Sequence, residues 1–364
     1  MTYDEALNFI INKQSLGIMP GLARIKKLLS LYDNPQDKIK IIHIAGTNGK
    51  GTVANSIANS LVDAGYKVGL FTSPWITDYR EQIQINGVPI SKERFSGITE
   101  SFALTDVGCS EFELVTAMAY IYFQDQKVDW AVIECGMGGL EDATNVEKKN
   151  ISVITSVSID HTNFLGSTIE EIAKQKAGII KKNSICILYP NPECEQIIEE
   201  VCSSKNAELI KVEPSDDYRL NNYNTVLHTL RAIGVDGSDV QLAQLTARQQ
   251  KIGNILVDGG HNVDAAMALA PVINNEIALI GMMKDKNIDG YLSLIAPKCK
   301  KIITTSANNP RSMPADELAN FAKKYCSDVC AIENPADALS FAKANGLTLL
   351  CGSFYLVRDI IKYI

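Results

Sequence analysis

At 364 residues with 46% hydrophobic content, the chain is long enough for two domains, each with its own core. Its formal charge of −7 argues against binding to nucleic acid, and the lack of a long apolar run argues against a membrane protein. We therefore expect small-molecule partners, with no nucleic acid and no membrane. Nine cysteines without a CxxC pair predict a protein without a disulfide framework or a zinc module, and a reducing compartment, the cytoplasm, fits this pattern. We also expect a monomer.

Short apolar runs alternate with helical patterns along the N-terminal part of the chain. Thr2 and Glu5 have the spacing of a capping box, which predicts a first helix through about residue 13, and a second helix is predicted at about 22–31. Further strands are predicted at 39–45, 67–71, 130–134 and 151–157, and further helices at 50–64, 111–126, 168–178 and about 223–233. This alternation predicts a P-loop-type, doubly wound α/β domain with a mostly parallel sheet.

Three later features complete the predicted organisation. Residues 82–90 alternate polar and apolar side chains around Asn86-Gly87, which predicts a β-hairpin that forms a flap beside the site. A domain at 1–235 and a polar linker at 236–252 are expected, followed at 253–364 by a smaller, Rossmann-like α/β domain. The strands predicted in this second domain lie at 255–258, 277–281, 301–305, 329–332 and 347–351.

One glycine-rich segment indicates nucleotide chemistry. The apolar residues 41–45 lead into Gly46-Thr47-Asn48-Gly49-Lys50-Gly51-Thr52, where a helix is predicted to begin. In such a loop, backbone N–H groups and the helix N-terminus bind the phosphates of ATP, Lys50 reaches the β- and γ-phosphates, and Thr52 meets Mg²⁺. A tight strand-to-helix connection is the structural alternative. The spacing departs from the usual G-x4-G-K-[ST], because Ile44 takes the place of the first glycine.

This variant loop resembles that of the Mur ligase superfamily, and within it the folylpolyglutamate synthase and dihydrofolate synthase branch. Further motifs of that branch follow in order: Phe71-Thr72-Ser73-Pro74, Phe112-Glu113-Leu114-Val115-Thr116, Glu134-Cys135-Gly136-Met137-Gly138-Gly139, Asp142-Ala143-Thr144-Asn145, Asp160-His161, Lys176-Ala177-Gly178-Ile179, Asp258-Gly259-Gly260-His261-Asn262 and Cys351-Gly352-Ser353-Phe354-Tyr355. The resemblance implies an ATP-dependent, ADP-forming ligase. It would join glutamate to the carboxylate of a pterin- or folate-type acceptor through an acyl phosphate.

The resemblance also implies two Mg²⁺ ions and a catalytic role for Lys50, His161 and Lys176. Ser73, Glu134 and His161 would hold one ion, although a single histidine at a strand end is more often an ordinary hydrogen-bonded residue. By its position alone, Lys176 near a helix end would complement the helix dipole. The family implies instead that CO₂ carbamylates Lys176, which then holds the second Mg²⁺.

Two further sets of binding residues come from the resemblance. The nucleotide contacts beyond the glycine-rich loop would be Asn224, Arg248, Asp258 and His261. The acceptor contacts would be Phe112, Glu113, Asp142 and Ala143. For Asp258, capping of a helix N-terminus is the structural alternative.

Three positions depart from the family pattern, all on the acceptor side. Trp75 stands in place of a histidine, and Gln82 and Leu140 each stand in place of an arginine. Three hypotheses remain open: dihydrofolate or folylpolyglutamate synthase activity, a related ligase for a different carboxylate, and a non-catalytic ATP-binding regulator. The intact Lys50 and Lys176 argue against the third hypothesis.

Overall fold

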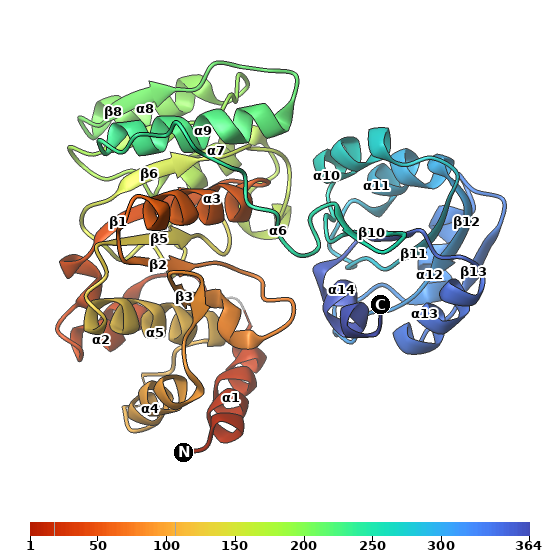
Figure 1. Cartoon of the computed structure of the whole chain (residues 1–364), viewed down its shortest axis with the longest axis horizontal. Coiled ribbons are helices and arrows are strands. Elements are labelled where there is room, and N and C mark those ends of the chain that lie inside the picture. Colours follow the sequence, from red (N-terminus) through yellow and green to blue (C-terminus); the bar gives the residue numbers. More distant parts are fainter. Residues whose placement is uncertain (18, 106) are drawn as a thin grey trace. The chain divides into compact units, whose positions relative to one another are not determined.

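The computed structural model describes residues 1–17, 19–105 and 107–364. They form two compact units, one of residues 1–75 and 79–243 and one of residues 76–78 and 244–364 (Figure 1). The division after residue 243 falls within the polar stretch 236–252. Among the described residues, no helix has the length and apolar character needed to cross a membrane.

The first unit is built on an eight-stranded sheet with the order β4-β3-β2-β5-β1-β6-β7-β8. Its strands are β1 (Lys40–Ala45), β2 (Val68–Phe71), β3 (Ile83–Ile85), β4 (Val88–Pro89), β5 (Trp130–Glu134), β6 (Ile151–Ile154), β7 (Ile185–Leu188) and β8 (Glu208–Lys211). All neighbouring strands are parallel except in the pairs β2–β3 and β3–β4. Because β1 lies between β5 and β6, the residues that follow these three strands meet at one edge of the sheet.

Helices cover both faces of this sheet, as Figure 1 shows. On one face α3 (Lys50–Asp63) and α9 (Tyr218–Ala232) pack against Ile42 and Ile44 of β1. On the other face α5 (Glu111–Asp125) packs against Ile41 of the same strand. The remaining helices of the unit are α1 (Tyr3–Asn12), α2 (Ala23–Ser30), α4 (Lys92–Ala103), α6 (Thr162–Leu165), α7 (Ile169–Ala177) and α8 (Glu195–Ser204). The doubly wound α/β fold predicted from the sequence is therefore confirmed.

Two local features predicted from the sequence, the capping box of α1 and the hairpin at Asn86-Gly87, are present in the structure. The capping box of α1 is present, with the Thr2 N–H donating to Glu5 Oε2 at 2.8 Å and the Glu5 N–H to Thr2 Oγ1 at 3.3 Å. The hairpin is also confirmed, because Asn86 and Gly87 both have positive φ values, 49° and 75°. It is not a flap, however. Strand β3 pairs with β2, so the hairpin extends the edge of the sheet.

The second unit contains a six-stranded sheet with the order β13-β12-β11-β14-β10-β9. Its strands are β9 (Gln250–Ile252), β10 (Ile255–Asp258), β11 (Glu276–Ile280), β12 (Cys299–Thr304), β13 (Val329–Ala331) and β14 (Leu349–Cys351). Its helices are α10 (Val263–Leu269), α11 (Ile288–Ile295), α12 (Ala315–Ala322), α13 (Pro335–Ala344) and α14 (Phe354–Ile360). Strand β9, at the sheet's edge, is antiparallel to β10 and lies within the stretch expected to be a linker, so residues 250–252 are a correction to that expectation.

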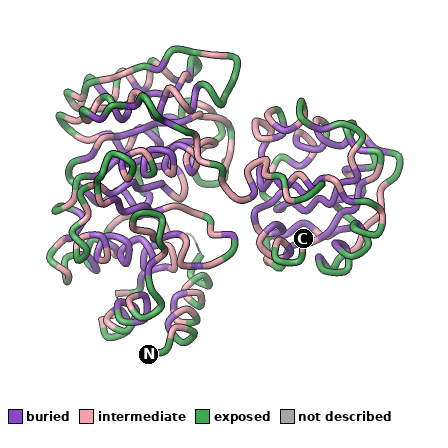
Figure 2. The backbone as a smooth tube through the Cα atoms, viewed as in Figure 1, coloured by how far each residue is buried: buried purple, intermediate pink, exposed green. Residues whose placement is uncertain are grey.

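The second unit also has helices on both faces of its sheet. Helices α10, α11 and α12 share one apolar core with the sheet, and α13 and α14 share another. The strands and the inner sides of the helices are buried, whereas the connecting segments are largely exposed (Figure 2). This arrangement confirms the Rossmann-like second domain.

Candidate active site

The glycine-rich loop follows β1 and is bonded to the segment that follows β6. The Thr47 N–H donates to the Ser156 carbonyl at 2.6 Å, and the Asn48 N–H donates to Ser156 Oγ at 3.2 Å. A Cβ on Gly46 would lie 1.8 Å from Thr155 Oγ1, so no larger residue fits there without rearrangement. These contacts hold the loop in one conformation at the edge of the sheet where ligands bind in such folds.

Helix α3 begins directly after the loop. Gly49, its N-cap, has a φ of 85°, a left-handed conformation that glycine adopts without the strain caused by a Cβ. Lys50 is the first helical residue, and its Nζ donates to the Thr47 carbonyl at 3.2 Å, across the loop. The predicted strand, turn and helix with an inward-facing lysine are thus all present.

The neighbour of this loop on α9 is Asn222, which the sequence reasoning missed. A Cβ on Gly49 would lie 2.9 Å from Asn222 Oδ1, and Asn222 is buried. Asn224, the predicted nucleotide contact, lies two residues further along the same helix and therefore points about 200° away. The helical period predicts that Asn222 and Asn224 lie on opposite faces, but its use here required the bounds of α9.

We expect Asn222→Ala to raise the KM for ATP by about tenfold, because it removes a carboxamide beside the phosphate loop. Asn224→Ala is the matched control, with an expected change below about twofold. Steady-state kinetics with varied ATP measure both values. A larger rise in the KM for ATP in Asn224→Ala than in Asn222→Ala would indicate that Asn224 is the nucleotide contact.

Ser73 and Glu134 lie together at the ends of β2 and β5. The Ser73 N–H donates to Glu134 Oε2 at 3.2 Å, and Glu134 is only 2% exposed. The Ser73–Pro74 peptide bond is cis. His161 caps α6 with a φ of 52°, and its Nε2 lies 3.9 Å from Asp160 Oδ2. The three predicted metal ligands therefore lie at the end of β5 and after β2 and β6, strands that are close to one another in the sheet.

Lys176 is a buried amine in the last turn of α7. It is 2% exposed. Burial, together with the nearby positive charge of Lys50, lowers the pKa of Lys176 to about 7. The helix-dipole explanation alone would leave this lysine at the surface and charged. Instead the structure provides a buried amine near Lys50 of the phosphate loop, with a pKa low enough for about half of it to be neutral at pH 7.

Two predicted acceptor residues, Phe112 and Ala143, differ in their surroundings. A Cβ on Gly136 would lie 2.6 Å from the Phe112 ring, and the ring centroid lies 5.9 Å from that of Phe71. Phe112 therefore covers the segment that follows β5. Ala143 is 8% exposed and belongs to the apolar core beneath that segment.

The carboxylates of Glu113 and Asp142 are bonded to their own segments of the chain. Glu113 Oε2 accepts from the Ser110 N–H at 2.8 Å, as part of the capping box of α5, and from Arg24 Nε at 3.1 Å. Its Oε1 is buried without a hydrogen-bond partner among the described residues. Asp142 accepts from the Met137 N–H at 2.7 Å and from the Thr144 hydroxyl at 2.6 Å. Both residues at least shape the region where an acceptor is predicted to bind.

In the second unit, Arg248 and Asp258 lie in one cluster. The Arg248 guanidinium lies 4.2 Å from the centre of the Phe354 ring. Asp258 accepts from the Gln249 and Gly260 N–H groups at 2.9 and 2.8 Å. Burial raises the pKa of Asp258, and Arg248 opposes this shift. Asp258 is not an N-cap, since Asn262 caps α10 by accepting from the Ala265 N–H at 2.9 Å.

Phe354 connects the residues of this cluster, although the sequence analysis did not single it out. The His261 ring lies edge-on to it at 6.0 Å, and a Cβ on Gly259 would lie 2.2 Å from its ring. His261 Nδ1 lies 3.3 Å from the Gly259 carbonyl, to which it can donate. The aromatic residue in Gly352-Ser353-Phe354 was the available signal in the sequence.

Comparison with known families decides the identity. The model described as "Mur ligase middle domain" matches residues 44–272, more than half of the chain, and that described as "Mur ligase, glutamate ligase domain" matches residues 244–354. The chain belongs to the Mur ligase family. A Bacillus subtilis dihydrofolate synthase/folylpolyglutamate synthase is 31% identical to this Mur ligase, over 99% of the chain and 98% of the relative. The Escherichia coli enzyme of the same name is 28% identical, over 98% and 94%.

Solved structures agree with this assignment. The Mur ligase matches Escherichia coli FolC in complex with DHPP and ADP, with a TM-score of 0.86 and 26% identity over 100% of the chain and 97% of that structure. It also matches a bifunctional folylpolyglutamate synthase/dihydrofolate synthase, solved with Mn, AMPPNP and L-glutamate bound, with a TM-score of 0.87 and 27% identity over 100% of the chain and 98% of that structure. This Mur ligase therefore lies in the dihydrofolate synthase/folylpolyglutamate synthase branch and is an ATP-dependent, ADP-forming ligase.

The three departures from the family pattern differ in exposure in this Mur ligase. The Trp75 ring is partly buried and packs against Tyr79 at 5.7 Å. Gln82 is buried, and its Nε2 donates to the Tyr79 carbonyl at 3.1 Å, so its side-chain amide is engaged in a hydrogen bond within the protein. Leu140 is 47% exposed, while its N–H donates to the Gln175 carbonyl at 2.7 Å. Of the three, Leu140 presents the largest change on the surface.

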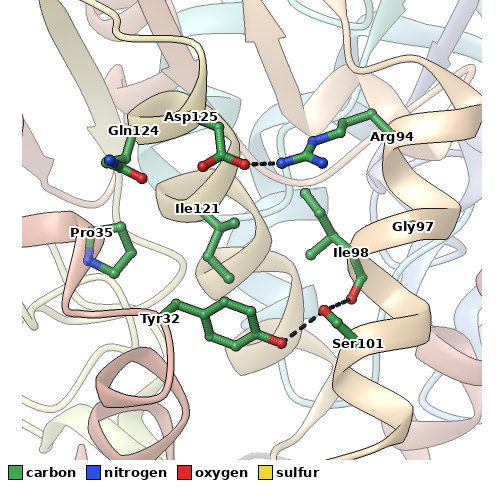
Figure 3. A pocket seen from close by; sticks show the side chains of 9 residues that line it. All are labelled: Tyr32, Pro35, Arg94, Gly97, Ile98, Ser101, Ile121, Gln124 and Asp125. Atoms are coloured by element: carbon green, nitrogen blue, oxygen red, sulfur yellow. Dashed lines mark hydrogen bonds and ion pairs between the residues drawn. The ribbon is translucent and has the colours of Figure 1, made fainter.

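A separate pocket of about 280 Å³ lies elsewhere in the first unit of the Mur ligase (Figure 3). An ion pair between Arg94 and Asp125 and a 2.8 Å hydrogen bond between Tyr32 and Ser101 lie along its walls. None of the predicted site residues lines it. Its full lining is Tyr32, Pro35, Arg94, Gly97, Ile98, Ser101, Ile121, Gln124 and Asp125.

Proposed function

We propose that this ligase joins glutamate to the carboxylate of a pterin-bearing acceptor, as its relatives' names indicate for them, while ATP is converted to ADP. The observation that supports this most strongly is the phosphate loop with Lys50 and, near it, the buried amine of Lys176. Membership of a ligase family sets aside the hypothesis of a non-catalytic regulator.

The proposed first step activates the acceptor. Backbone N–H groups at Gly46 to Thr52 bind the phosphates of ATP, and Lys50 exchanges its bond to the Thr47 carbonyl for the transferring phosphoryl group. The acceptor carboxylate attacks the γ-phosphorus, which releases ADP and leaves an acyl phosphate. During this transfer, Lys50 offsets the charge that develops on the phosphoryl oxygens.

The residues at the ends of β2, β5 and β6 suit Mg²⁺. Ser73 and Thr52 offer hydroxyl oxygens and Glu134 a buried carboxylate, which are ligands that this ion prefers, and His161 is a less usual partner. We propose that Ser73, Glu134 and His161 hold one ion. Thr52 and a carbamylated Lys176 would serve the second. When bound, Mg²⁺ offsets negative charge on the phosphates.

The proposed second step forms the amide. The neutral amine of glutamate attacks the acyl carbon and its nitrogen loses a proton to solvent, after which the tetrahedral intermediate collapses to the amide and inorganic phosphate leaves. Phe112 and the loop containing Asp142 and Ala143 would position the acceptor for this attack, with Glu113 supporting that surface from α5. Exclusion of water matters at this stage, because acyl phosphates hydrolyse readily.

Further nucleotide contacts are proposed in each unit. In the second unit, Arg248 and His261 share the Phe354 ring, and the Asp258 carboxylate is held rigidly by two N–H groups. Such a fixed carboxylate suits a ribose hydroxyl. On α9 of the first unit, Asn222 is favoured by its contact with the loop, and Asn224 was predicted from the sequence. We also propose that the protein is a monomer and that it is located in the cytoplasm, since nine free cysteines fit a reducing compartment.

The decisive experiment is an ADP-release assay on the purified protein. ATP and Mg²⁺ would be combined with glutamate and either dihydropteroate, folates or unrelated carboxylates. We expect release that requires both glutamate and a pterin-bearing acceptor. Turnover with unrelated carboxylates alone would support the second hypothesis, a ligase for a different acceptor, which the exposed Leu140 favours.

A related prediction concerns the length of the glutamyl chain. Because Leu140 replaces a cation on an exposed surface, we expect one glutamate to be added to dihydropteroate with a higher kcat/KM than to a folate diglutamate. Leu140→Arg should raise kcat/KM for the diglutamate by about tenfold and leave dihydropteroate nearly unchanged. Leu140→Met is the uncharged control. Efficient extension by the unaltered enzyme would contradict the prediction.

A further inference from the structure

His43 is a fully buried polar residue in the central strand of the first unit's sheet. Its exposure is 0%, and it belongs to β1, the strand that leads into the phosphate loop. Along this strand Ile42 and Ile44 face α3, so His43 faces the opposite side, where α5 packs. The proposed chemistry does not use His43, and burial of an imidazole in such a place requires hydrogen-bond partners.

The hydrogen bonds of His43 determine its protonation. Nδ1 lies 2.9 Å from Glu147 Oε1, and Nε2 lies 2.8 Å from Thr144 Oγ1. A carboxylate can only accept, so Nδ1 donates. With Asp142 ionised, the single hydroxyl hydrogen of Thr144 is directed to Asp142 Oδ1 at 2.6 Å, and Nε2 then donates to Thr144 Oγ1. In this arrangement both ring nitrogens carry hydrogen, which makes His43 an imidazolium.

The groups around the ring favour this charge. Burial would lower the pKa of His43, but the nearby Cys135 and Glu147 outweigh it and raise the pKa to about 10. Cys135 Sγ lies 3.1 Å from Nε2. Lys181 Nζ lies 3.5 Å from Glu147 Oε1, and the Tyr120 hydroxyl donates to the Thr144 carbonyl at 2.8 Å.

The same hydrogen bonds organise the loop that follows β5. Asp142 accepts from Thr144 and also from the Met137 N–H at 2.7 Å, which closes residues 137–144 into a compact turn. His43 is the link from this turn to β1. The strand before the phosphate loop and the loop proposed to hold the acceptor are thus joined through one buried ring.

We propose that His43 is a positioning residue, which through Thr144 fixes Asp142 and thereby sets the acceptor loop relative to the phosphate loop. The proposal rests on the proposed function, in which one loop binds the acceptor and the other binds ATP. The geometry that carries it is the continuous chain of hydrogen bonds from Glu147 through His43 and Thr144 to Asp142.

The kinetic test uses Thr144→Val, which keeps the shape of the side chain but removes the hydroxyl between His43 and Asp142. We expect the KM for the acceptor to rise by about tenfold or more, while the KM for ATP stays within about twofold. His43→Gln should behave alike, and the double variant should be no worse than His43→Gln, because both interrupt one chain. Ser152→Ala is the matched control: Ser152 is buried beside His43 on β6, outside this chain.

A second measurement is independent of activity. The chain has four histidines, so comparison with His43→Gln assigns the His43 ring signals by nitrogen-15 NMR. We expect both ring nitrogens to be protonated at pH 8, and the Met137 and Thr144 amides to exchange faster with solvent in Thr144→Val than in Ser152→Ala. If no acceptor supports turnover, the proposed function fails but these signals still test the link. A neutral His43 ring, or an acceptor KM unchanged in folded Thr144→Val, would overturn the inference.

Discussion

Lys50→Ala is expected to lower turnover by at least about a thousandfold, because it removes the cation that serves the transferring phosphoryl group. The fold should persist, since the substitution removes a hydrogen bond from Nζ to the Thr47 carbonyl at 3.2 Å and the side chain is only half-buried. ADP release and circular dichroism on the same sample measure the two effects.

An exposed lysine supplies the control for this experiment. Lys26→Ala lies on α2, outside the predicted site, and should keep full activity. Lys50→Arg tests whether charge alone is sufficient. We expect little recovery, because the guanidinium is larger and planar and does not replace a compact ammonium group in this loop. Substantial turnover by folded Lys50→Ala would show that the loop does not bind the reacting phosphate.

Lys176→Ala should lose activity by a similar factor if the buried amine becomes a carbamate, since both its new oxygens would be missing. Formate or acetate should restore part of the activity by filling the vacated space with a carboxylate. Lys176→Met has nearly the same side-chain length without a nitrogen, and should be inactive without any such rescue. Recovery of Lys176→Met would contradict the carbamate, as would an unmodified Lys176 in the mass spectrum of active enzyme.

The pKa of Lys176 gives this modification a pH dependence. Only the neutral amine reacts with CO₂, and with a pKa of about 7 about half of Lys176 is neutral at pH 7 and about a tenth at pH 6. At constant dissolved CO₂, reactivation of CO₂-depleted enzyme should therefore be about fivefold slower at pH 6 than at pH 7. A rate independent of pH in this interval would contradict a neutral amine as the reacting group.

Features that depend on neighbouring residues were predictable from the sequence. The capping box at Thr2 and Glu5 and the Asn86-Gly87 turn have local causes, so both appear where they were expected. The strand, loop and helix around Lys50 also follow from a short pattern. By contrast, β8 was missed because it lies at a sheet edge and is only partly buried, which weakens the apolar pattern of a strand.

Features that depend on long-range contacts were not predictable in the same way. The choice between Asn222 and Asn224 depends on which face of α9 meets the phosphate loop. His43 is one polar residue in an apolar strand, and its partner Glu147 is 104 residues away. Phe354 and Arg248 are likewise far apart in sequence. A buried polar residue in the run Ile41 to Ala45 was a usable signal, but only the structure supplies its partners.

The bonds between the phosphate loop and the segment after β6 also bear on how the chain folds. The side-chain contacts join residues 107 to 111 positions apart, so the nucleotide site cannot form from its own sequence segment. It requires β1 and β6 to pair first, and contacts of high sequence separation form slowly. During refolding, capture of a fluorescent ATP analogue should therefore lag behind the recovery of helical circular dichroism and report the completed centre of the sheet.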